Sequence, residues 1–161
     1  MCGIAGQFCY GSALPDEKLL AEMSKRLAHR GPDGQGTYVS GRIGLAHRRL
    51  AIIDLSDDAR QPMANEDGSM WLVYNGEIYN YVELRAGLAA KGHTFRSKTD
   101  SEVILHAYEE WGTECLQHLN GMWAFALWDE RKQQLFCARD RFGSKPFYYT
   151  RSEERRVGKE V

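Results

Sequence analysis

The chain opens with Met1-Cys2-Gly3-Ile4-Ala5-Gly6, and this stretch decides how the rest of the sequence is interpreted. Removal of Met1 would leave a thiol and a free α-amino group on one residue, Cys2. The pKa of an α-amino group is about 7.7–8.0, so an appreciable fraction is uncharged at neutral pH and can take a proton from a thiol. A nucleophile and its base can therefore occupy a single residue.

The composition is that of an ordinary globular domain. The chain has 161 residues, of which 43% are hydrophobic and 27% are charged, enough for one domain with a sizeable core. The net charge of −1 gives no electrostatic reason to expect a nucleic acid or an anionic membrane as partner. With no apolar run near 18 residues and no secretory signal, we predict a cytoplasmic protein.

The remaining cysteines are Cys9, Cys115 and Cys137. They lack the close pairs that are typical of zinc sites, so we predict no metal in this chain. We expect them to be reduced, small, buried hydrophobic residues.

The order of apolar periods and turn signals predicts an α+β fold. The predicted strands cover residues 3–9, 42–54, 71–74, 122–128 and 135–139, and another begins at 146–149. One helix is expected to open at residues 15–17 with Ser12 as a candidate cap, a second to span 80–91 before Gly92, and a third to run from Thr99 to Gly112.

Several polar residues at the edges of these elements are candidates for a site. Arg49 on an apolar strand should meet a carboxylate, either of the protein or of a substrate. The donors of Asn75 and Gly76 could meet at one point as an oxyanion hole, or the pair could be a simple β-turn. Asp100 could serve a site or only the positive end of its helix. The loop at 29–36 could be a shaped turn beside a site, or only a helix stop followed by a strand.

Eight motifs, in this order, resemble the glutaminase domain of class II glutamine amidotransferases, and among them the asparagine synthetase type. The resemblance spans residues 1–150. The motifs are MCGIAG (1–6), HRGPDG (29–34), HRRLAIID (47–54), QPM (61–63), YNGEIYN (74–80), TDSE (99–102), NGMWAFA (120–126) and RDRFGSKP (139–146).

The resemblance implies an N-terminal-nucleophile hydrolase fold, an αββα sandwich of two antiparallel sheets between helical layers. It implies an enzyme that hydrolyses glutamine to glutamate and ammonia. Cys2 would be the nucleophile, and Asn75 and Gly76 would form the oxyanion hole.

The same resemblance implies how L-glutamine would bind. Arg49 would hold the α-carboxylate, while Glu77 and Asp100 would face the α-amino group. Backbone groups near Leu50, Ile52 and Ile53 would line the pocket.

The resemblance also sets the expected domain organisation. Residues 2–150 would form the amidotransferase domain, incomplete at its C-terminal end, and the charged tail at 151–161 would be non-native. An ATP-dependent synthetase domain would receive the ammonia. Its Ser-Gly-Gly-x-Asp-Ser type of motif does not occur here, so we expect no cofactor in this chain and ATP and Mg²⁺ only in that domain. A homodimer is a further candidate assembly.

Two alternatives remain open from the sequence. One is the glutaminase domain of a related amidotransferase with another acceptor. The other is an inactive, truncated fragment that binds glutamine. A papain-like enzyme is disfavoured because its cysteine signature does not occur and His47 is the one tempting partner.

Overall fold

Two antiparallel sheets form the centre of the protein, whose computed structural model describes residues 1–151. Most of the predicted tail at 151–161 therefore lies outside the described residues. The first sheet has the order β1-β3-β2, formed by Gly3–Phe8, Ile43–Arg49 and Gly34–Ser40. The second has the order β4-β5-β6-β7, formed by Met63–Ala64, Met70–Ile78, Gly121–Asp129 and Gln134–Arg139.

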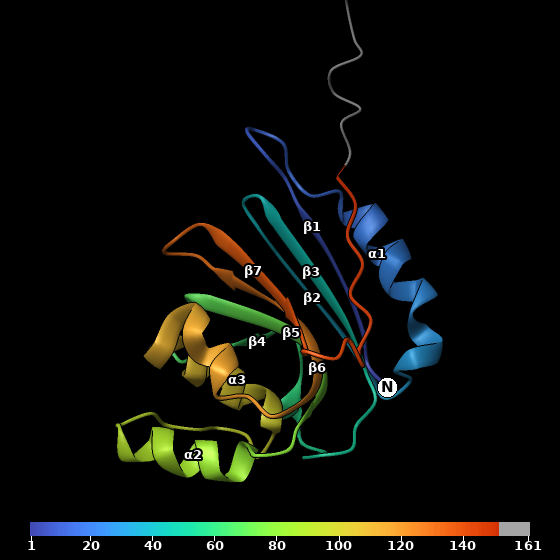
Figure 1. Ribbon diagram of the computed structural model, residues 1–161. Helices are drawn as coiled ribbons and strands as arrows, with labels where there is room; N and C mark the ends of the chain where they lie inside the picture. The colour runs from blue at the N-terminus through green and yellow to red at the C-terminus, as the bar shows by residue number, and fades with distance from the viewer. Residues whose placement is uncertain (152–161) are drawn as a thin grey trace, which may run out of the picture.

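Helices cover the outer face of each sheet (Figure 1). Helix α1 packs on β1 and β3, whereas α3 packs on β5 and α2 packs on α3. The helices are Glu17–Arg26 (α1), Tyr81–Ala90 (α2) and Asp100–Trp111 (α3), and short 3₁₀ turns lie at Ala28–Arg30, Asp57–Ala59 and Gly112–Gln117. The predicted order of layers, helix, sheet, sheet and helix, is confirmed. No described helix is long and apolar enough to cross a membrane.

The two sheets are held face to face by alternate residues of their strands, because successive side chains of a strand point to opposite faces. Ile43 and Leu45 of β3 form one cluster with Val73 of β5 and with Ala126 and Trp128 of β6. The opposite face of the second sheet packs against α3. Its cluster includes Leu72, Tyr74, Phe125, Leu127, Ile104 and Leu105.

The helix boundaries follow local capping chemistry. Thr99 caps α3 by accepting a hydrogen bond from Glu102 N, and Gly112 ends that helix with φ +57°. Helix α2 ends before Gly92, as predicted. The predicted cap of α1 is wrong, because Asp16 rather than Ser12 accepts from the first-turn amides, at 2.9 and 3.1 Å.

Strand β3 is shorter and strand β5 is longer than the sequence pattern predicts. β3 ends at Arg49 because the next amides leave the ladder: Leu50 N donates to Cys2 Sγ, and Ala51 N donates to Asp33 Oδ2 at 2.9 Å. β5 runs straight through Asn75-Gly76, which is paired with β6, so the β-turn alternative for this dipeptide is wrong. Residues 34–36 of the predicted loop belong to β2.

The strand predicted from residue 146 does not form in the described residues. Phe147 packs against the cluster between the sheets, but Tyr148 and Tyr149 are exposed and no neighbouring strand pairs with them. Among the cysteines, Cys115 is buried as predicted, Cys9 is half-buried, and Cys137 is exposed on the edge strand β7. The prediction that Cys137 is buried is therefore wrong.

Replacing Leu105 with alanine should test the packing of α3. Leu105 is fully buried, so removal of its side chain leaves a cavity and should lower the free energy of unfolding by about 2–5 kcal/mol. Urea denaturation measures the change. The control is Leu19→Ala on α1, whose side chain is 52% exposed and should cost less than about 1 kcal/mol. Equal losses in both variants would contradict the packing described here.

Candidate active site

All nine residues that the sequence singles out line one pocket. They come from the N-terminus, from the end of β3 and the segment after it, from β5, and from the start of α3. They are Cys2, Arg49, Leu50, Ile52, Ile53, Asn75, Gly76, Glu77 and Asp100. The structure therefore brings together residues up to about a hundred positions apart in the sequence.

Strand pairing fixes the position of Cys2. β1 pairs with β3 so that Gly3 lies opposite Arg48, which puts Cys2 beside the residues that follow β3. Leu50 N donates to Cys2 Sγ at 3.4 Å, and the thiol lies 3.7 Å from Leu50 O. Arg30 Nε donates to Cys2 O at 3.1 Å, so both the side chain and the backbone of Cys2 are held.

Asn75 and Gly76 lie where β5 and β6 approach closely. Gly76 is paired with Trp123, and a Cβ atom at this glycine would collide with the carbonyl oxygen of Met122 and lie 2.6 Å from Trp123 Cα. Only glycine fits this contact. Asn75 is buried, and both residues line the pocket.

The guanidinium of Arg49 is held by backbone carbonyl groups. It donates to Ser56 O at 3.0 Å and to Asp54 O, and it forms no ion pair within residues 1–151. The expected carboxylate is thus not one of the described protein groups. Asp54 shapes this loop by accepting from Lys98 N at 2.7 Å, a bond that, with bonds from Ser56, lowers the pKa of Asp54 to about 2.

Asp100 is a buried acidic residue that lines the same pocket as Arg49. Its Oδ2 accepts from Tyr74 OH at 2.6 Å and from Ile78 N at 2.9 Å. Burial raises the pKa of Asp100, the two hydrogen bonds oppose that rise, and the charge of Glu77 adds to it. A cationic group placed beside Asp100 and Glu77 would stabilise the ionised form of the Asp100 carboxyl group.

The sequence reasoning missed several residues of the pocket. Tyr74 orients Asp100, and Gln61 Oε1 accepts from Tyr74 N at 2.6 Å. Lys145 is buried and reaches the pocket because Asp140 accepts from its backbone N at 2.9 Å. Lys145 Nζ lies 3.0 Å from Met1 Sδ. The motifs at 61–63, 74–80 and 139–146 contain these residues, but nothing in the neighbouring sequence indicates what each of them contacts.

The pocket combines a thiol, amide donors, a guanidinium and two carboxyl groups. A guanidinium and a pair of carboxylates complement the two charges of an amino acid zwitterion. A thiol near amide donors suits nucleophilic attack on a carbonyl carbon.

Comparison with known proteins agrees with this chemistry. A family model described as a glutamine amidotransferase domain matches residues 1–159. An asparagine synthetase (glutamine-hydrolysing) of Bacillus subtilis is 44% identical over 154 residues, which cover 94% of this chain and 25% of that protein. An asparagine synthetase (glutamine-hydrolysing) of Oryza sativa is 44% identical over 149 residues, which cover 92% of this chain and 25% of that protein.

One solved structure supports the fold. The glutamine phosphoribosylpyrophosphate amidotransferase of B. subtilis superposes with a TM-score of 0.52 at 26% identity, over 63% of this chain and 24% of that one. The likeness confirms the N-terminal-nucleophile hydrolase fold expected from the sequence. The chain belongs to the glutamine amidotransferase domain family, and the predicted resemblance to the asparagine synthetase type is confirmed. It spans about a quarter of the length of the asparagine synthetases that it matches.

Replacing Gly76 with alanine should separate β5 from β6 at the pocket. The added methyl group would overlap backbone atoms that cannot rotate away, so the free energy of unfolding should fall by about 1–3 kcal/mol. Gly87→Ala is the matched control, because this glycine lies in α2 with open space around it and should gain about 0.5–1 kcal/mol. Thermal or urea unfolding compares the two. An unchanged stability of Gly76→Ala would refute the close approach.

Proposed function

We propose that this domain catalyses the hydrolysis of L-glutamine to glutamate and ammonia, and that the ammonia is supplied to an ATP-dependent asparagine synthetase domain of the whole protein. The observation that carries the proposal is the convergence of Cys2, Arg49, Asn75, Glu77 and Asp100 on one pocket. The identity of 42–45% to glutamine-hydrolysing asparagine synthetases supports the choice of substrate and of acceptor.

The charges of the pocket support glutamine as the bound amino acid. Arg49 carries a guanidinium that no described carboxylate neutralises, so it is available for the α-carboxylate of a substrate. Glu77 and Asp100 are available for the α-ammonium group. With both ends fixed, the side-chain carboxamide is directed towards Cys2.

The reaction begins with Cys2 after Met1 is removed. The α-amine takes the thiol proton, and the thiolate attacks the carboxamide carbon. The negative charge that develops on the carboxamide oxygen is stabilised by the Asn75 side-chain NH2 and the Gly76 N–H. Loss of one such donor typically costs about 2.7–4 kcal/mol in activation free energy.

The tetrahedral intermediate then collapses. The C–N bond breaks, the nitrogen receives the proton held by the α-amine, and ammonia leaves a γ-glutamyl thioester on Cys2. The neutral amine next takes a proton from water, whose oxygen attacks the thioester carbon. The C–S bond breaks, the thiolate regains its proton, and glutamate is released.

Cys2→Ala should abolish glutamine hydrolysis. Loss of the attacking sulfur should reduce the rate at least ~10³-fold, which a coupled assay for glutamate measures. Cys137→Ala is the control, since its exposed thiol lies outside the pocket and its loss should leave the rate unchanged. A Cys2→Ala protein that keeps its activity would refute the proposal.

Retention of residues before Cys2 should be equally damaging. An uncleaved N-terminal extension turns the α-amine into an amide that cannot accept a proton, and Met1 itself lines the pocket. Activity should fall by about 10²–10⁴-fold, the usual contribution of a general base. Placing a protease site directly before Cys2 provides the control, because cleavage should restore the rate. Full activity of the uncleaved form would show that the amine is not the base.

A further inference from the structure

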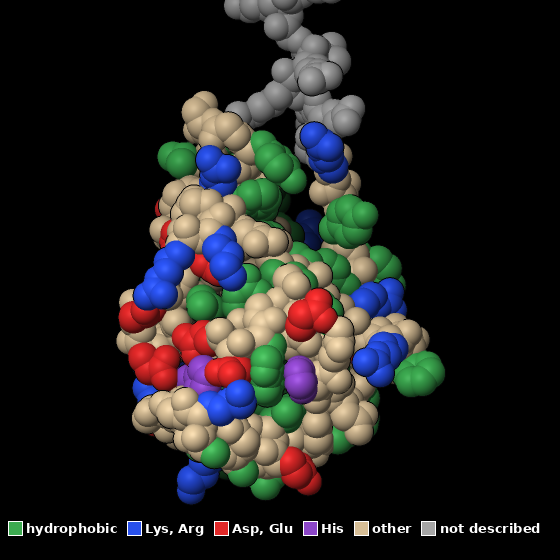
Figure 2. Space-filling model, turned by 60° about the vertical axis from the view of Figure 1, so that its left-hand side comes forward, with side chains coloured by type: hydrophobic (Ala, Val, Ile, Leu, Met, Phe, Trp, Pro, Cys, Tyr) green, Lys and Arg blue, Asp and Glu red, His purple; other side chains and the backbone are tan. Residues whose placement is uncertain are grey.

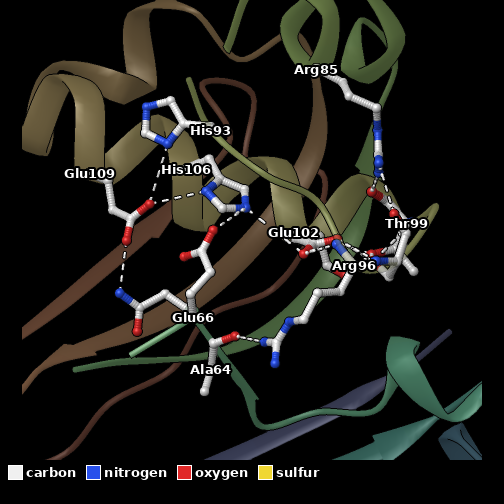
Figure 3. A network of polar contacts seen from close by, with 12 residues as sticks. Ala64, Glu66, Arg85, His93, Arg96, Thr99, Glu102, His106 and Glu109 are labelled. Atoms are coloured by element: carbon white, nitrogen blue, oxygen red, sulfur yellow. Dashed lines mark hydrogen bonds and ion pairs between the residues drawn. The ribbon is translucent and has the colours of Figure 1, made fainter. Parts of the chain in front are cut away.

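A second cluster of side chains that can bind a metal ion lies on and beside α3, among residues that do not line the pocket. His106 and Glu109 are one helical turn apart on α3, and His93 comes from the segment between α2 and α3 (Figure 3). Glu109 Oε2 lies 3.0 Å from His106 Nδ1 and 3.4 Å from His93 Nδ1. One ligand atom from each of the three residues falls within 4.8 Å of the others.

These separations resemble those of a metal centre. Four ligands at about 2.0–2.1 Å from Zn²⁺ in a tetrahedron lie about 3.3 Å from one another. Two of the three separations are already near this value. The third separation, between the two imidazole nitrogens, is within 4.8 Å and would have to shorten. His93 can approach His106 because it belongs to a connecting segment rather than to a helix.

Groups behind the cluster are arranged as they are around bound metals. His93 Nε2 lies 3.3 Å from Glu110 Oε2, within hydrogen-bond reach. The separation of 3.8 Å between His106 Nε2 and Glu102 Oε1 is longer than a hydrogen bond and leaves Glu102 near this imidazole only as a charge. Glu109 Oε1 accepts from Asn65 Nδ2 at 2.7 Å. Metal-binding histidines usually donate their outer N–H to a carboxylate, and metal-binding carboxylates are themselves hydrogen-bonded, which orients the ligands.

The charge around the cluster favours a cation. Glu66 Oε1 lies 3.9 Å from His106 Nε2, so four carboxylates surround the two imidazoles, and Lys91 pairs with Glu110. Figure 2 shows Asp and Glu side chains gathered around a histidine on the face that contains α3.

The site is accessible to an ion from solvent. The side chain of His106 is 2% exposed, but those of His93 and Glu109 are 15% and 20% exposed, so the ligand atoms lie just beneath the surface. A water molecule from solvent can therefore complete four-fold coordination.

We propose that His93, His106 and Glu109 bind a divalent transition-metal ion, Zn²⁺ by preference, at a site separate from the amidohydrolase pocket. Two imidazoles and a carboxylate are the ligands that suit zinc and disfavour Mg²⁺ or Ca²⁺. The ion displaces the proton that His106 Nδ1 shares with Glu109 Oε2, and this proton passes to solvent. Bound metal links the 91–99 segment to α3 and so stabilises the connection that leads into Asp100.

Equilibrium dialysis of the intact protein against ZnCl₂ tests the proposal, with His93→Gln and Glu109→Gln as the site variants. Glu109→Gln keeps the size of the side chain and one acceptor oxygen but removes the charge and the second oxygen. The control is His118→Gln, because His118 is an exposed histidine that stacks on Trp111, outside the cluster. All variants retain the same four cysteines, so differences in zinc uptake report on the cluster. Far-ultraviolet circular dichroism confirms that each variant is folded.

The expected result is one Zn²⁺ per chain in the wild type and in His118→Gln, with the dissociation constant raised at least ~10-fold in both site variants. Co²⁺ should give the visible bands of a tetrahedral nitrogen and oxygen site, without the sulfur-to-metal charge-transfer band of a thiolate site. Equal uptake in the wild type and His93→Gln, no uptake, or a thiolate spectrum would each overturn the proposal. None of these results depends on glutamine hydrolysis.

Discussion

The pairing of β1 with β3 is the constraint on which the site depends. It aligns Gly3 with Arg48, and this register carries the N-terminus to the end of β3, where the Leu50 amide meets the Cys2 sulfur. A shift by one residue would turn Cys2 to the face that carries α1. The HRGPDG loop supports the same place from outside, because Asp33 accepts from Ala51 N and a side chain at Gly31 would collide with the backbone of Arg48.

Much of the fold and the membership of the site could be predicted from the sequence. A glycine follows the end of α2, a threonine cap and a glycine bound α3, and the nine residues expected at the site line one pocket. The remaining features were decided by contacts between residues far apart in the sequence, which override local preferences. Asn75-Gly76 has the local preference of a turn, but its pairing with β6 keeps it extended. The strand expected at 146–149 lacks a described neighbour to accept its hydrogen bonds. No local pattern reveals that Tyr74 would reach Asp100.

The polar cluster on α3 shows a second limit of sequence patterns. The sequence argued against a metal only through its cysteines, which form no close pairs, and the two histidines lie 13 positions apart without any metal-site spacing to mark them. The structure brings His93 and His106 together because the 91–99 segment folds back along α3. Its return is fixed by Glu102, which accepts from Arg96 N at 2.8 Å and from Ser97 N at 2.7 Å. Ligands from a loop and a helix have no fixed spacing, so only a three-dimensional view can find them.

The hydrogen bonds of Asp100 and Arg49 attach the two charged parts of the pocket to different parts of the fold. The Asp100 carboxylate is joined to β5 through Tyr74 OH and Ile78 N, so it can move only if the central sheet moves with it. Arg49 is held by carbonyl groups of the loop at 54–56, which is itself tied to the segment leading into α3 by the bond from Lys98 N to Asp54. A ligand's ammonium end would therefore meet a position set by the sheet, and its carboxylate end would meet a position set by a loop and its anchor.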